Sequence, residues 1–83
     1  MISIQSTAQL GTALRLTRKQ LGLTQSQLAL AAGVGIRFVV DVEAGKPTLR
    51  FETVLKVIDA LGGTLMLTGL AAPSDIKDDN DGT

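Results

Sequence analysis

Apolar residues recur at helical spacing in four stretches of the 83-residue chain, and each stretch ends at a glycine. The first predicted helix follows Ser6 or Thr7, whose side-chain oxygen is placed to cap its N-terminus, and it ends at Gly22. Before it, the alternating residues 1–5 predict a short strand or an extended arm. The inward face of this helix consists of Leu10, Ala13, Leu14, Thr17 and Leu21.

Two shorter helices are predicted next. Thr24, followed three residues later by Gln27, has the capping-box pattern, and the helix that it opens ends at Gly33. A third helix is predicted from about residue 36 to residue 44, before Gly45. Its β-branched run favours a strand by propensity, but the flanking glycines and the surrounding motif favour a helix.

A fourth helix is predicted to start at Pro47 and Thr48 and to end at Gly62. Its apolar stripe consists of Phe51, Val54, Leu55, Ile58 and Leu61. Residues 64–69 then alternate at period two, which predicts a strand containing Leu65, Met66 and Leu67. A single strand has no partner in a four-helix domain, so it pairs either with the arm at residues 2–4 or with its own copy in a homodimer.

The composition argues against several classes of function. The chain has no Cys and no His, so it lacks a thiolate nucleophile, the commonest metal ligand and the commonest general base. We therefore expect no enzyme activity, no metal and no cofactor. Only 2% of the residues are aromatic, which disfavours RNA modules that stack bases on aromatic side chains. No apolar run is long enough for a membrane span and no signal-peptide pattern is present, so a cytoplasmic protein is expected.

Charge divides the chain into two parts. Residues 1–70 carry a net charge of +3 and are predicted to form one domain, since a chain of this size builds only one core. Residues 71–83 carry a net charge of −3 and are predicted to be a mobile acidic tail, with docking on a partner protein as the alternative. A basic body with an acidic tail hints at a domain that binds a polyanion.

Residues 23–45 carry the most informative motif, two short helices separated by a glycine-containing turn. Ala29 is small where the two helices must cross closely, and Gly33 permits a sharp turn. Val34 and Val39 are apolar where the wedge between the helices must be filled. These features predict a helix-turn-helix.

The stretch LTQSQLA, the turn glycine and the closing Glu43 resemble the Cro and lambda-repressor type of helix-turn-helix domain. The stretch RFVVDVEAGKPTLRFETVLKVIDALG further resembles the HipB-type antitoxins, which are DNA-binding repressors encoded beside a HipA-like kinase toxin. The resemblance implies a strand that pairs between the subunits of a dimer. It also implies two partners, a palindromic operator in double-stranded DNA and a HipA-like serine/threonine kinase toxin.

Candidate base-reading residues lie on the outward face of the second motif helix, because Val39 and Val42 point inward. This face presents Ile36, Arg37, Val40 and Asp41. Arg37 suits guanine, Ile36 suits a thymine methyl group, and Asp41 either accepts from cytosine or orients Arg37. Ile36 and Val40 stand where related proteins often hold polar residues, so specificity is expected to be weak or to depend partly on DNA shape.

Candidate phosphate contacts lie at the helix ends and in the following loop, at Gln25, Gly35, Lys46 and Arg50. For Gln25, the resemblance implies donation to a DNA phosphate. It also implies a structural ion pair between Arg18 and Glu43, which ties the motif to the first helix.

The predicted fold is all-α, a four-helix Cro/lambda-repressor-like domain with a C-terminal strand that pairs across a homodimer. The predicted function is sequence-specific repression by an antitoxin that binds its own operator and a kinase toxin. A stand-alone phage-type or regulatory repressor is the first alternative. The second is a protein-interaction module whose helix-turn-helix has lost DNA binding.

Overall fold

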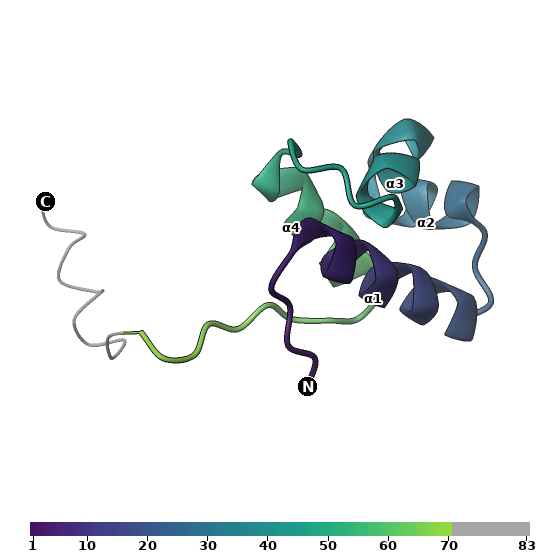
Figure 1. Cartoon of the computed structure of the whole chain (residues 1–83). Coiled ribbons are helices and arrows are strands. Elements are labelled where there is room, and N and C mark those ends of the chain that lie inside the picture. The colour runs from purple at the N-terminus through teal and green to yellow at the C-terminus, as the bar shows by residue number, and fades with distance from the viewer. Residues whose placement is uncertain (71–83) are drawn as a thin grey trace, which may run out of the picture.

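The computed structural model describes residues 1–70 of the chain, and within them it forms four α-helices (Figure 1). The helices are α1 (Thr7–Gln20), α2 (Gln25–Ala32), α3 (Ile36–Glu43) and α4 (Phe51–Ala60). The all-helical prediction is confirmed, including a helix for α3 despite its β-branched residues. The predicted acidic tail, residues 71–83, lies outside the described residues. Within residues 1–70, no helix has the length and apolar character needed to span a bilayer.

Short polar caps set the first two helix starts, as the sequence predicts. Ser6 accepts a hydrogen bond from the backbone N–H of Gln9 at 3.1 Å. Thr24 accepts from the backbone N–H of Gln27 at 3.0 Å, and the Gln27 side chain accepts from the backbone N–H of Thr24 at 2.8 Å. Gly33 ends α2 in the left-handed conformation at a φ of 72°, which an L side chain rarely adopts.

The core lies where the four helices meet, with α3 packed against both α1 and α2, and α4 packed against α2. Its largest fully buried side chains are Leu28, Val39, Val42 and Val57. Leu28 comes from α2, Val39 and Val42 from α3, and Val57 from α4, so the motif helices share one core with α4. This shared core fixes the inner face of α3 and leaves its outer face to solvent.

Gly11 allows α1 to lie directly on the C-terminal end of α3. A Cβ added to Gly11 would lie 2.5 Å from the carbonyl oxygen of Val42 and 2.7 Å from that of Glu43. Both obstacles are backbone atoms, so no side-chain movement relieves the overlap. This close approach sets the distance between the two helices.

The prediction for α4 was wrong in two respects. The helix begins at Phe51 rather than at Pro47, because residues 47–50 form bends and an extended Arg50 cap. The buried face also differs from the predicted stripe, since Phe51 is 61% exposed and Leu55 is 38% exposed, whereas Val57 is fully buried. The residues that face the core are Val54, Val57 and Ile58 of the helix and Leu61 at its C-cap.

The predicted strand at 64–69 is not formed in the single chain, whose residues 1–70 contain no strand. A strand needs a second strand for its backbone hydrogen bonds, and the arm at residues 1–5 does not pair with it. Residues 63–68 instead run past the N-terminal arm without regular secondary structure (Figure 1). Leu65, Met66 and Leu67 are 42%, 71% and 75% exposed.

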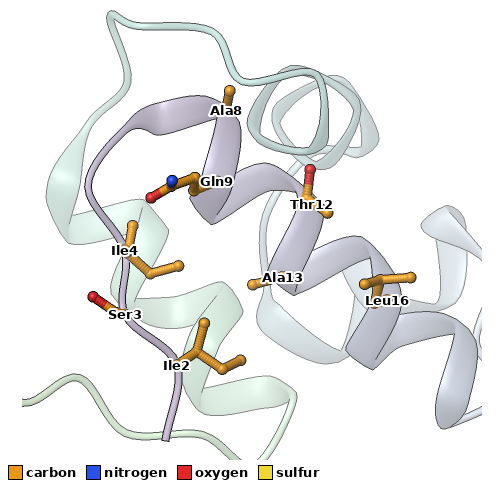
Figure 2. Close-up of a pocket in the computed structure, with 8 residues that line it drawn as sticks. All are labelled: Ile2, Ser3, Ile4, Ala8, Gln9, Thr12, Ala13 and Leu16. Carbon is orange, nitrogen blue, oxygen red and sulfur yellow. The ribbon is translucent and has the colours of Figure 1, made fainter.

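An open apolar groove lies between α1 and α4. Its walls are the N-terminal arm and the segment 63–68, and its floor includes Leu14 and Ile58. Figure 2 shows Ile2 and Ile4 of the arm on the same side of α1 as Ala13. A second, more open hollow therefore lies between the arm and α1, with Ala8, Ala13 and Leu16 among its lining residues.

Candidate nucleic-acid interface

The α2–turn–α3 unit is held rigid from within. Leu28 and Val39 are fully buried and Ala29 is 4% exposed, which is the close helix crossing that the sequence predicts. The backbone N–H of Val34 donates to the carbonyl of Ala29 at 3.0 Å across the turn, beside the left-handed Gly33. The orientation of α3 is therefore fixed by packing and by the turn together.

The outer face of α3 carries the four residues predicted to read bases. Ile36 and Arg37 are exposed, while Val40 and Asp41 are half-buried. The structure thus places all four residues on one face of α3. Gly35 caps the N-terminus of α3 without a side-chain hydrogen bond.

Two cations share the carboxylate of Asp41. Its Oδ1 lies 3.3 Å from Nε of Arg37, one turn earlier on α3. Its Oδ2 lies 3.7 Å from Nζ of Lys46 in the loop after α3. The base-reading and phosphate-binding candidates are therefore electrostatically connected, whereas Arg50 makes no ion pair within residues 1–70.

Behind α3, the structure brings Arg18 and Glu43 together in a buried ion pair. Nε of Arg18 lies 2.6 Å from Oε2 of Glu43, and Nη2 donates to Oε1 at 3.0 Å. Nη1 of Arg18 donates to the carbonyl of Leu23 at 2.8 Å. The two side chains are 9% and 4% exposed, so this cluster ties α1 to the end of α3 and to the start of the motif.

Gln25 joins the same cluster, which sequence reasoning missed. Its Nε2 donates to Oε1 of Glu43 at 3.1 Å, across 18 residues of sequence. The amide nitrogen of Gln25 carries two N–H groups, and Glu43 accepts a hydrogen bond from one of them. Nothing in local spacing signals this contact, because it forms only when α2 and α3 pack.

The cluster shifts the pKa values of both its ionisable members. Burial acts to raise the pKa of Glu43, but hydrogen bonds from Arg18 and Gln25 and the nearby positive charges outweigh it and lower that pKa. The hydrogen bond to Glu43 raises the pKa of the Arg18 guanidinium. The pair is therefore charged at neutral pH.

In the part of the chain that the structure describes, no three acidic side chains gather, and the sequence contains no Cys or His. Instead, the exposed cations Arg37 and Lys46 flank one helix face of a domain whose residues 1–70 carry a net charge of +3. Such a face is suited to contact a polyanion.

A helix-turn-helix family model matches residues 14–66. The chain belongs to the helix-turn-helix family. It is 49% identical over 59 residues to the uncharacterized HTH-type transcriptional regulator y4mF of Sinorhizobium fredii, over 71% of this chain and 78% of that protein. A Haemophilus influenzae HTH-type transcriptional regulator, also uncharacterized, is 37% identical over 54 residues, or 65% of this chain and 55% of that one.

Solved structures of HipB share the fold. The HipB chain of the HipB-O4 20mer complex matches with a TM-score of 0.77 and 28% identity, over 86% of this chain and 100% of that one. HipB in the HipB-O1-O2 complex matches with a TM-score of 0.75 and 30% identity, over 81% and 97%. A chain of the HipA-HipB-O2-O3 complex matches with a TM-score of 0.77 and 28% identity, over 86% and 100%. The chain is a helix-turn-helix transcriptional regulator with a HipB-like fold.

Proposed function

We propose that this regulator is a sequence-specific DNA-binding repressor. The observation that carries the proposal is the outer face of α3, where Arg37 projects with 83% of its side chain exposed from a helix that is locked on its other side by buried valines. A rigid helix with a projecting guanidinium fits the major groove, where Arg grips O6 and N7 of guanine. The likeness to HipB in the HipB-O4 20mer complex supports the same reading.

The proposed contacts divide into two groups. Base edges are met by Ile36, Arg37 and Val40, while Asp41 either accepts from cytosine or orients Arg37. Phosphates are met by Gln25, Gly35, Lys46 and Arg50. Ile36 is 48% exposed and Val40 is half-buried. Because both side chains are aliphatic, their readout is limited to apolar contacts such as the thymine methyl. Sequence-dependent DNA shape supplies the remaining specificity.

We propose further that the regulator acts as a homodimer. Leu65, Met66 and Leu67 are exposed on the single chain, beside an apolar groove that also exposes Phe51. Pairing of residues 64–69 with the same segment of a second copy would satisfy their backbone groups and cover these side chains. It would also place two recognition helices about one DNA turn apart, which fits a palindromic operator.

The physiological role that fits best is that of an antitoxin. The likeness to HipB within the HipA-HipB-O2-O3 complex supports a HipA-like serine/threonine kinase toxin as the partner. A cytoplasmic location on the nucleoid follows from the proposed DNA binding. A stand-alone repressor shares every interface described above except the one for the toxin. Co-purification with a kinase encoded by the adjacent gene separates the two, and the lack of any such gene favours the stand-alone repressor.

Fluorescence anisotropy with the DNA upstream of the gene tests the proposal. If a dimer contacts about six phosphates, log K falls against log[salt] with a slope of about −5. Arg37→Ala is expected to reduce the preference for this DNA over a scrambled duplex, whereas Lys46→Ala weakens both equally. Equal loss from both substitutions contradicts these roles. No binding to any duplex at low salt would favour the protein-interaction module.

A further inference from the structure

Asp41 is a carboxylate on the one face of the domain that is proposed to meet DNA. Its side chain is 19% exposed, against 83% for Arg37 and 52% for Lys46, so the carboxylate is anchored while the cations extend past it. Oδ1 lies 3.3 Å from Nε of Arg37 and Oδ2 lies 3.7 Å from Nζ of Lys46. Each oxygen therefore has its own cation.

This arrangement constrains how Arg37 can bind DNA. The carboxylate of Asp41 lies on the Nε side of the Arg37 guanidinium. The two Nη groups at the end of the side chain therefore remain available to DNA. Two parallel N–H groups at that end match O6 and N7 of guanine. Arg37 can thus contact guanine while it keeps its contact with Asp41.

The same arrangement disfavours DNA without the matching guanine. If Arg37 moves to a phosphate instead, it loses its contact with Asp41. The negative charge of Asp41 then faces the phosphate backbone with only Lys46 to compensate it. A carboxylate near phosphates repels them whatever the base sequence, and a complex that keeps the Arg37–Asp41 contact compensates this charge. The penalty therefore falls mainly on non-specific complexes.

We propose that Asp41 is a specificity-determining residue of this interface, which positions Arg37 for guanine and weakens binding to DNA that lacks this guanine. Asp41 is then a positioning residue rather than a reader of cytosine. The inference rests on the proposed function. Asp41 then increases the discrimination between DNA sequences and lowers the overall affinity for DNA.

The test uses duplexes that the wild-type chain enriches from a random-sequence library, together with scrambled versions of the same composition. Asp41→Asn keeps the shape and removes the charge. We expect it to bind scrambled DNA three- to tenfold more tightly and to lose roughly tenfold in the ratio of selected to scrambled affinity, in line with one bidentate base contact. Asp59→Asn removes the same charge from α4, outside the helix-turn-helix, and is the matched control, expected to leave the ratio unchanged.

Position-by-position base substitution in the selected duplex shows which contact is lost. We expect Asp41→Asn to relax the preference at the same guanine positions as Arg37→Ala, and to cause no further relaxation when the two are combined. Asp41→Glu keeps the charge but moves it by one methylene group. It is expected to hold scrambled affinity near the wild-type value while the guanine preference falls.

Two results would overturn the inference while leaving DNA binding intact. One is an equal change in affinity for selected and scrambled DNA in Asp41→Asn. The other is loss of preference at a cytosine position that Arg37→Ala leaves untouched, which would make Asp41 a direct base reader. A wild-type chain that enriches no sequence is a separate result, and it overturns the proposed function along with the inference.

Discussion

Replacing Glu43 by Gln should destabilise the domain more than any surface change, because it leaves the Arg18 guanidinium buried without its counter-charge. Arg18 is 9% exposed at its side chain and makes two of its three hydrogen bonds to Glu43. Removing one partner of a buried pair costs about 3–5 kcal/mol. We expect about 3 kcal/mol here, the low end of that range, because part of Arg18 still reaches water and its bond to Leu23 remains.

Urea titration measures this loss. A domain of this size has a total stability of about 4–10 kcal/mol and an m-value of about 1 kcal/mol per M, so the midpoint should fall by about 3 M. Protein concentration must be held constant, because dimer formation would contribute to apparent stability. Lys19→Ala is the matched control, since Lys19 is the exposed neighbour of Arg18 on α1, and it should change stability by less than about 0.5 kcal/mol.

The double variant Arg18→Met with Glu43→Leu decides whether the buried charge is the cause. Two apolar side chains of similar size remove the unpaired charge, so stability should return to within about 1 kcal/mol of the wild type. The reasoning is refuted if the losses of stability in Arg18→Met alone and in Glu43→Leu alone simply add up to the loss in the double variant. It is also refuted if Glu43→Gln moves the urea midpoint by less than about 0.5 M.

Glu43 should also make the stability of the domain depend on pH in the acid range. The folded pKa of Glu43 lies below its ordinary value of 4.5, so its contribution is fully present above pH 4.5 and is lost as pH falls through the folded value. Wild-type stability, followed by urea midpoints between neutral and acid pH, should therefore decline below pH 4.5. The Glu43→Gln variant should lack this part of the decline, and a parallel decline in both proteins would assign it to other groups.

Three further outcomes are expected. Gly11→Ala should lower stability by about 1–3 kcal/mol in thermal unfolding, because its Cβ would overlap two backbone carbonyls of α3, whereas Thr12→Ala beside it should have little effect. Leu65→Asp or Leu67→Asp should convert the proposed homodimer to monomer in analytical sedimentation, and an unchanged dimer for both would show that the segment 64–69 does not form the interface. Removal of residues 73–83, with a net charge of −3, should leave operator affinity equal or slightly tighter in anisotropy, and a large loss would contradict this.

Local signals in the sequence predicted most of the fold. The caps at Ser6 and Thr24, the left-handed turn at Gly33 and the inward valines of α3 depend on neighbours within a few residues, and all are present in the structure. The start of α4 was predicted wrongly because proline is common both in the first turn of a helix and in a bend before one.

Contacts between distant parts of the chain could not be predicted in this way. The fit of Gly11 against α3 and the Gln25–Glu43 hydrogen bond join residues that meet only after packing. The exposure of Phe51 likewise depends on the groove beside α4 rather than on helical periodicity. Of the candidate site, the sequence predicted the helix face but not the pairing of Lys46 with Asp41.

The two carboxylates of α3 lie on opposite faces of one short helix, one toward the core and one toward the proposed DNA interface. Asp41 and Glu43 are two residues apart, so on an α-helix their side chains point about 200° apart. Glu43 faces inward at 4% exposure and holds Arg18 and Gln25, while Asp41 faces outward and holds Arg37 and Lys46. The effects of their substitution should therefore diverge: Glu43→Gln lowers the urea midpoint, whereas Asp41→Asn leaves it nearly unchanged and changes DNA binding, with tighter binding to scrambled DNA and a weaker preference for the selected sequence. If Asp41→Asn were as destabilising as Glu43→Gln, Asp41 would be part of the scaffold rather than a determinant of recognition.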